Sequence, residues 1–266
     1  MDWDRTAKRF SGRVAIVPGS SADPSIGRAC AYRLAREGAS IVINGRDASR
    51  LDAAERAFLA EGLEVTAVAG SMEDESVVAQ LVDAAVDRFG RLDFLVNTIG
   101  GTRYRGPFDV MTEAELIDTL RLNTWPAMAL IQVALRHGLA EGGGAVVNIS
   151  SGSPRKTTSS MVAYAAAKAC LNALTRTMAA DLARRSVRVN AVSPGLTRTT
   201  ATRDLWAEDG GRSAGAPLPV GRLTEAGDIA GAAAFLLSDE ARQITGVVLD
   251  VDGGNHLAGG GWSPMP

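Results

Sequence analysis

The chain has few of the residues that build metal sites or disulfide frameworks. Its 266 residues include two cysteines and two histidines. His137 and His256 have no partners at metal-ligand spacing in the sequence, so we expect no metal site. Cys30 and Cys170 both fall in expected helices, which favours two reduced core residues and therefore a cytoplasmic protein.

Long apolar runs and a strong imbalance of charge are missing as well. No run reaches the length that crosses a membrane, and the N-terminal Met-Asp-Trp-Asp-Arg lacks the apolar core of a signal peptide. The net charge of −2 gives no reason to expect nucleic acid or an anionic membrane as a partner. With 46% hydrophobic residues and no linker or repeat, residues 1–266 are expected to form a single α/β domain.

Short apolar runs alternate with longer helical patterns along the chain. Seven strands are predicted, at residues 14–17, 40–44, 64–69, 93–97, 145–149, 187–192 and 247–250. Helices are expected between them, and several end at a glycine. Right-handed crossovers then give a parallel sheet covered on both faces, a doubly wound Rossmann-type fold of three αβα layers. The irregular segment 200–219, rich in Gly, Ala and Pro, is expected to be either disordered or a lid over a substrate site.

One alanine-rich helix carries a tyrosine and a lysine four residues apart. Tyr164 and Lys168 therefore lie on the same helix face, about one turn from each other. A nearby ammonium group favours the phenolate and is expected to lower the pKa of Tyr164. A tyrosine tuned in this way can exchange a proton with an alcohol or a carbonyl. A coincidental pair on an ordinary amphipathic helix explains these two residues equally well.

The turn after the first strand has the features of a phosphate-binding loop. It begins at Gly19, contains Ser21 and Ser25, and leads into a helix at Ile26 and Gly27. Small residues let the backbone approach a pyrophosphate, and the start of the helix supplies free N–H groups. A generic Gly/Ser turn is the alternative interpretation.

The end of the second strand indicates which dinucleotide is preferred. An acidic residue there would accept hydrogen bonds from the ribose hydroxyls of NAD, but the sequence has Gly45. Arg46 follows and can pair with a 2′-phosphate, which favours NADP(H) over NAD(H). A solvated surface arginine is the alternative.

From residue 12 to residue 254 the chain resembles the short-chain dehydrogenase/reductase family. The motifs occur in the family's order: Asn97-Thr-Ile-Gly100, Asn123, Ser151, Tyr164, Lys168, the segment Pro194-Gly195-Leu-Thr197-Arg-Thr199, and Asp250-Val-Asp252-Gly-Gly. The resemblance implies four catalytic residues: Asn123, Ser151, Tyr164 and Lys168. It also implies a cofactor site made of Gly19, Ser21, Ser25, Ile26, Gly27, Arg46, Ser71, Asn97, Gly100, Tyr164, Lys168, Pro194, Gly195, Thr197 and Thr199.

The resemblance implies hydride transfer between a nicotinamide and a small carbonyl compound or secondary alcohol, as in a ketoreductase. Ser151 and Tyr164 would bind the substrate oxygen, Tyr164 would exchange the proton, Lys168 would assist it and bind the nicotinamide ribose, and Asn123 would hold a relay water. The family also implies a homotetramer or homodimer, in which the Tyr164 helix pairs across a twofold axis. Residues 178, 179 and 182 are candidates for that surface, with internal core as an equal alternative.

Several residues depart from the family pattern. Pro18 replaces a threonine and offers neither an N–H nor a hydroxyl, so the usual tether to the next strand is expected to be lost. The interval from Gly19 to Gly27 is two residues longer than usual, and Ser25 stands in place of the middle glycine. Gly70 replaces the aspartate that follows the third strand. A double asparagine is replaced by Asn97-Thr98.

These departures leave two other functions open. The Gly-x5-Ser-Ile loop resembles the enoyl-reductase branch of the family, although that branch spaces its Tyr and Lys more widely. A dinucleotide-binding sensor or scaffold without catalysis would tolerate a weakened phosphate loop. The substrate also stays open, because four basic residues could attract an acidic group or could be solvated loop charges: Arg103, Arg105, Arg155 and Lys156.

Overall fold

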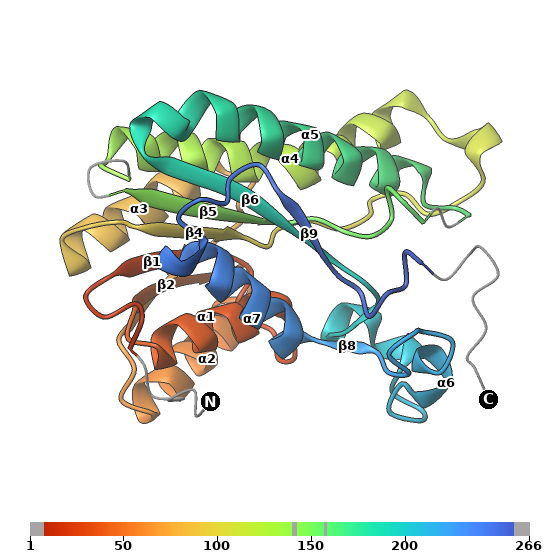
Figure 1. Cartoon of the computed structure of the whole chain (residues 1–266), viewed down its shortest axis with the longest axis horizontal. Helices are drawn as coiled ribbons and strands as arrows, with labels where there is room; N and C mark the ends of the chain where they lie inside the picture. Colours follow the sequence, from red (N-terminus) through yellow and green to blue (C-terminus); the bar gives the residue numbers. More distant parts are fainter. Residues whose placement is uncertain (1–7, 140–142, 157–158, 258–266) are drawn as a thin grey trace.

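The computed structural model describes residues 8–139, 143–156 and 159–257. The tail 259–266, which the sequence indicates is flexible or packed on a partner, lies outside these ranges. In the described part, seven parallel strands form one sheet in the order β3-β2-β1-β4-β5-β6-β9 (Figure 1). These strands are β1 Val14–Val17, β2 Ser40–Gly45, β3 Val65–Ala69, β4 Phe94–Asn97, β5 Gly144–Ile149, β6 Val187–Pro194 and β9 Val248–Val251.

Helices cover both faces of the sheet and complete the three predicted layers. Figure 1 shows α1 (Ile26–Arg36), α2 (Ala48–Ala60) and α7 (Ala226–Leu237) on one face. The other face carries α3 (Glu75–Phe89), α4 (Glu113–Arg136) and α5 (Val162–Leu182). A separate cluster of buried apolar side chains fills the space between the sheet and each helical layer. Burial from both sides explains why the strands are apolar throughout rather than alternating.

The sequence predicts the regular elements well because their ends carry local signals. Asp47 and Asp74 cap α2 and α3 through their side chains, and Thr112 with Glu115 forms the expected capping box of α4. Gly90 ends α3 in the left-handed conformation, with φ at 77°. The seven predicted strands are confirmed, with boundaries that differ by at most two residues, and helices lie between them as expected.

The region predicted as an irregular lid contains short regular elements. A small parallel pair joins β7 (Thr197–Arg198) to β8 (Thr224–Glu225). Between these strands lie the 3-10 helix η3 (Thr200–Leu205) and the short helix α6 (Arg212–Gly215). Three further 3-10 turns are η1 (Phe108–Val110), η2 (Ala183–Arg185) and η4 (Asp239–Ala241). Among the described residues, no helix is both long and apolar enough to cross a membrane.

The structure settles two expectations about burial. Both cysteines are free, but only Cys30 is a core residue; Cys170 is half-buried, so its assignment to the core was wrong. Burial raises the pKa of the Cys30 thiol to about 12. Ala179 and Leu182 are buried in the core under α5, so they pack inside the subunit and do not form a subunit surface.

Candidate active site

The predicted site residues gather at the carboxyl ends of the central strands. The chain winds outward from β1 to β3, then returns to the other side of β1 with β4, so the winding reverses between β1 and β4. Ligands of doubly wound sheets bind at this reversal, outside the carboxyl ends of the strands. The turns after β1, β4, β5 and β6 carry the residues described below.

Ser151 and Tyr164 meet beside the end of β5. Ser151 lies in the turn that follows this strand, Tyr164 lies in the first turn of α5, and their side chains are hydrogen-bonded. The neighbouring Ser150 is buried and donates to Asn172 Oδ1 at 2.5 Å, beneath the site. The structure therefore favours Ser151 over Ser150 as the serine that accompanies Tyr164.

Lys168 lies under the tyrosine in a fully enclosed position. Its side chain is 3% exposed, its Nζ donates to the carbonyl of Ile149 at 2.9 Å, and Nζ is 5.8 Å from the centre of the Tyr164 ring. Burial lowers the pKa of Lys168 to about 8. The geometry brings together the pair that the four-residue spacing predicted.

The electrostatics of this pair differ from the sequence expectation. Burial raises the pKa of Tyr164, and the hydrogen bond with Ser151 only partly opposes that effect. In the chain alone Lys168 loses its proton at a lower pH than Tyr164 does, so it carries no charge when the phenol ionises. The expected lowering of the phenol pKa by Lys168 is thus not a property of the chain by itself.

Asn123 and Lys168 converge on Gly100. A Cβ atom on Gly100 would lie 2.5 Å from Asn123 Oδ1 and 2.8 Å from Lys168 Nζ, so only glycine leaves room for both groups. Asn123 Nδ2 donates to the carbonyls of Gly101 at 2.7 Å and Thr119 at 2.8 Å, while Oδ1 accepts from the Gly101 amide at 3.1 Å. One lone pair of Oδ1 is left for a further donor such as water.

The loop after β1 fits a pyrophosphate in spite of its extra length. Gly19 has φ at +69°, and a Cβ atom on Gly27 would lie 2.5 Å from the Gly19 carbonyl oxygen, so helix and loop touch through backbone alone. Ser25 replaces a glycine but gains a role of its own, because it caps α1 by accepting from the Arg28 amide at 3.0 Å. The amides of Ile26 and Gly27 begin the helix and are the groups that would bind an anion.

The departures at Pro18 and Thr98 compensate each other. Thr98 Oγ1 donates to the carbonyl of Pro18 at 2.5 Å and ties the end of β4 to the end of β1. The usual tether from a threonine at position 18 is lost as expected, but Thr98 supplies a different tether between the same two strands. Pro18 cannot donate, but its carbonyl accepts from the threonine that stands in place of the family's second asparagine.

The end of β2 has no space for an acidic side chain. A Cβ atom on Gly45 would lie 2.6 Å from the Cβ atom of Ser21, which reaches over from the lengthened loop. Arg46 is exposed beside this point and forms no ion pair within the described ranges, while Asp47 pairs with Arg50. Ser21 and Arg46 are thus the side chains that the structure presents at the end of β2.

Two predicted cofactor residues have structural partners of their own. Asn97 is buried, and its Nδ2 donates to Asn148 Oδ1 at 2.8 Å, so its side chain supports the sheet. Ser71 accepts from the Glu73 amide at 3.3 Å. Gly70 has φ at +139°, and a Cβ atom there would lie 2.5 Å from Val77 Cγ2, which excludes the aspartate that the family has at this position.

The segment after β6 lies against the Ser151 loop. The carbonyl of Pro194 accepts from the Gly152 amide at 3.0 Å. A Cβ atom on Gly195 would lie 2.8 Å from Asp252 Cα, so the close approach of the two backbone segments requires glycine at this position. Thr197 and Thr199 follow, both buried, and Thr197 Oγ1 donates to the Gly195 carbonyl at 2.9 Å.

Most of the basic side chains suggested for an acidic substrate are already paired within the chain. Arg103 contacts Glu73 at 2.6 Å, Arg155 pairs with Asp250, and Lys156 Nζ donates to Asn255 Oδ1 at 2.7 Å. Arg105 is exposed and has no ion pair in the part of the chain that the structure describes. The partners of Arg103, Arg155 and Lys156 therefore favour a structural role in the loops over the attraction of an acidic substrate.

Sequence reasoning missed a carboxylate and imidazole pair next to the Pro-Gly segment. His256 Nδ1 lies 2.9 Å from Asp252 Oδ2, and the amides of Gly254 and His256 also donate to Asp252, each at 2.9 Å. These bonds hold the pKa of Asp252 below its usual range although burial acts to raise it. The four-residue spacing of Asp252 and His256 was the available signal.

The fold and the glycine-lined turn at the winding reversal are typical of dinucleotide-binding α/β proteins. A family model described as enoyl-(acyl carrier protein) reductase matches residues 19–256. A cis-4-hydroxycyclohexanecarboxylate dehydrogenase of Sinomonas cyclohexanicum is 38% identical, covering 92% of this chain and 97% of the relative. Gluconate 5-dehydrogenase of Gluconobacter oxydans is 34% identical, covering 92% and 95%.

Solved structures give the same result. A short-chain type dehydrogenase/reductase from Mycobacterium ulcerans superposes with a TM-score of 0.86 at 32% identity, covering 94% of this chain and 91% of that one. A 7α-hydroxysteroid dehydrogenase complexed with NADH and 7-oxo glycochenodeoxycholic acid has a TM-score of 0.86 at 30% identity, covering 95% and 97%. The chain belongs to the short-chain dehydrogenase/reductase family, and it is an oxidoreductase of that family.

Proposed function

We propose that this protein is an NADP(H)-preferring oxidoreductase that interconverts a secondary alcohol and a ketone, with Tyr164 as general acid and base. The observation that carries the proposal is the convergence of three side chains: Ser151 acts on the Tyr164 phenol, and the buried Lys168 Nζ lies 5.8 Å from the centre of the Tyr164 ring. Relatives whose printed names specify hydroxycyclohexanecarboxylate, gluconate and hydroxysteroid dehydrogenases support alcohol and carbonyl chemistry.

In this mechanism the chain binds the substrate oxygen and moves one proton. The nicotinamide, when bound, exchanges a hydride with the carbon that carries the oxygen. Ser151 and Tyr164 hold that oxygen between two hydroxyl groups, and Tyr164 donates its proton during reduction or accepts one during oxidation. Lys168 supplies the adjacent amine, and Asn123 keeps one acceptor position for a relay water close to that amine.

The preference for NADP(H) rests on the end of β2. Gly45 offers no carboxylate for a 2′-hydroxyl, and Ser21 blocks the space that a carboxylate would need. Arg46 is exposed and is the cation nearest in sequence to this point, where a 2′-phosphate would add negative charge. Titration with NADPH and NADH tests this, because Arg46→Ala should weaken NADPH about tenfold and leave NADH unchanged. Equal losses for both dinucleotides would contradict this role.

An enoyl-type reductase that acts on a C=C bond is the second candidate. It is favoured by the description of the matching family model and by the loop that contains Ser25. The Tyr164 and Lys168 spacing and the names of the dehydrogenase relatives favour the first candidate. A cyclic ketone and an enoyl thioester, each assayed with NADPH, separate the two. Dinucleotide binding without turnover of either class would instead support a sensor or scaffold.

The decisive experiment for the proton donor is Tyr164→Phe. Turnover of the best ketone or alcohol should fall by about 10²–10⁴-fold, while the Kd of NADPH stays within about twofold. Tyr32→Phe is a matched control, because Tyr32 stacks on Phe58 at 4.0 Å in the layer of α1 and α2. Wild-type turnover in Tyr164→Phe would exclude this tyrosine as the donor.

We also expect a cytoplasmic homotetramer or homodimer built on the face of α4 and α5. In support, Ile117 and Trp125 are 54% and 38% exposed on α4, beside a shallow cavity that they line. Ile117→Glu should lower the mass measured by light scattering. Leu59→Glu is the control, because Leu59 is equally exposed on α2, on the other side of the sheet. An unchanged mass for Ile117→Glu would argue against this interface.

A further inference from the structure

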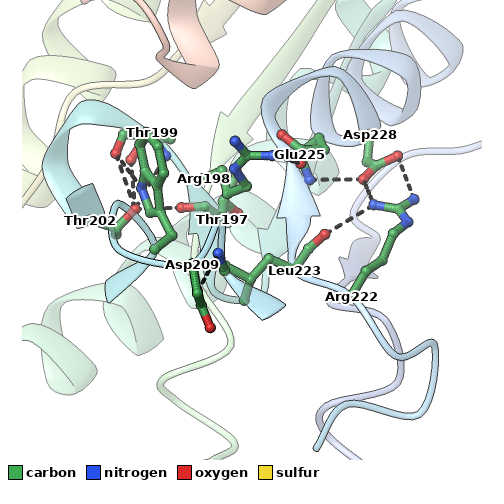
Figure 2. Close-up of polar contacts among 11 residues, drawn as sticks. Thr197, Arg198, Thr199, Thr202, Asp209, Arg222, Leu223, Glu225 and Asp228 are labelled. Atoms are coloured by element: carbon green, nitrogen blue, oxygen red, sulfur yellow. Dashed lines mark hydrogen bonds and ion pairs between the residues drawn. The ribbon is translucent and has the colours of Figure 1, made fainter. Parts of the chain in front are cut away.

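The segment between β7 and β8 is a loop whose two ends are clamped together. In this clamp Thr197 pairs with Thr224 and Arg198 pairs with Glu225 across the two short strands. Figure 2 shows Arg198 beside Glu225. The Arg198 guanidinium strengthens the clamp through Nη1, which lies 2.9 Å from Glu225 Oε1. The chain thus leaves and re-enters the domain at one point, and residues 199–223 form the lid between.

The first turn of the lid is folded onto the clamp. Trp206 Nε1 donates to the Thr199 carbonyl at 3.0 Å, and Arg198 Cζ lies 5.0 Å from the centre of the Trp206 ring. Asp209 orders the next turn by accepting from the amides of Gly211 and Ser213, at 2.8 and 2.7 Å. Trp206 therefore packs within the lid itself, and the lid is a preformed unit.

One residue joins this unit to the phosphate loop. The backbone amide of Thr200 donates to the Pro24 carbonyl at 2.8 Å, and its hydroxyl donates to the same oxygen at 3.0 Å. Pro24 lies between Gly19 and Gly27, in the interval that is two residues longer than the family pattern, and directly precedes Ser25, the cap of α1. The lengthened loop thus reaches the lid.

We propose that Thr200 is a positioning residue that fixes the lid to the phosphate loop, so that a dinucleotide held by this loop also sets the lid over the substrate. The proposal rests on the proposed function in one respect, the binding of a dinucleotide at residues 19–27. An anion on the first turn of α1 would immobilise Ser25 and Ile26. Pro24 directly precedes Ser25, so fixing Ser25 also restricts the movement of the Pro24 carbonyl. Thr200 donates to that carbonyl and is restricted with it.

The test compares Thr200→Val with Thr200→Ser. Valine keeps the amide bond and loses the hydroxyl bond, whereas serine keeps both. Trypsin reports on the lid, because Arg203 and Arg212 are exposed within it. Thr177→Val is the matched control, since Thr177 is an exposed residue of α5 whose hydroxyl donates to the carbonyl one turn before it, at 3.2 Å.

In the free protein, Thr200→Val should be cut in the lid about fivefold faster than wild type, the equilibrium equivalent of one hydrogen bond. Saturating NADPH should protect wild type and Thr200→Ser more than Thr200→Val. The KM for the substrate should rise about fivefold in Thr200→Val, with kcat and the Kd of NADPH within twofold of wild type. Thr177→Val should match wild type throughout.

Two results would overturn the proposal. Wild-type cleavage of the free Thr200→Val protein would show that the hydroxyl does not hold the lid. Faster cleavage with unchanged protection by NADPH and an unchanged KM would show that Thr200 only stabilises the lid locally. If the wild type binds neither dinucleotide, the proposed function fails and the coupling fails with it, while the free-protein comparison still decides whether Thr200 holds the lid.

Discussion

The buried lysine under Tyr164 should reduce the stability of the protein, and replacing it should show by how much. Lys168 is 3% exposed and has one hydrogen bond, to the carbonyl of Ile149. Its pKa falls from 10.5 to about 8 because burial disfavours the ammonium form. Below pH 8 the folded protein must keep a charge that the solvent would hold more favourably, at a cost of about 3 kcal/mol in the free energy of unfolding.

Lys168→Met removes this cost with a side chain of similar length. The carbonyl of Ile149 loses its donor, which costs about 1 kcal/mol, so the expected gain near pH 7 is about 2 kcal/mol. For a chain of this size that corresponds to a rise in Tm of about 4–8 °C. Activity should be lost in the same variant, because the amine beside Tyr164 is gone. Lys8→Met, at an exposed lysine, should change neither quantity.

The sign of the pH dependence provides the refutation. Between pH 8 and 10.5 the unfolded chain binds a proton at this lysine that the folded chain has released, so the stability contribution of Lys168 increases with pH over that window. The advantage of Lys168→Met should therefore shrink by about 2 kcal/mol between pH 7 and about pH 9.5. The measurement is urea unfolding at several pH values. The reasoning would be refuted if Lys168→Met were less stable than wild type at pH 7. It would also be refuted if the difference in free energy of unfolding between the two proteins were the same at every pH.

Three further changes test the cofactor loop. Gly27→Ala should destabilise the protein by about 1–3 kcal/mol and weaken dinucleotide binding, because the added Cβ would clash with the carbonyl of Gly19. The control in thermal unfolding is Gly227→Ala, whose added Cβ would meet no atom. Equal Tm values for the two variants would contradict the clash at Gly27. Thr98→Val should cost about 1 kcal/mol through the lost tether to β1, measured by urea unfolding, with no change expected if the tether contributes nothing. Gly45→Asp should unfold the loop after β1 or abolish dinucleotide binding, because the aspartate would clash with Ser21. The double variant Gly45→Asp with Ser21→Gly should bind NADH. Binding of NADH by the single variant would show that the Ser21 side chain moves aside.

The sequence by itself determined the fold and named the residues of the proposed catalytic set. Apolar strands, capping residues and terminal glycines are local signals, and each specifies an element without reference to distant residues. The spacing of Tyr164 and Lys168 placed both on one helix face, and the turn after β5 placed Ser151 beside them. The ordered motifs were sufficient to recognise the family.

Only the tertiary structure decided how the departures from the family pattern work together. Thr98 and Pro18 are 80 positions apart, and Thr200 and Pro24 are 176 apart, so no local rule links them. The charge state of Lys168 was likewise undecided, because a pKa depends on burial, and burial depends on every element packed around a residue. Sequence spacing fixes which face of a helix a side chain occupies, whereas contacts between loops and the desolvation of a charge exist only once the whole sheet and both helical layers have assembled.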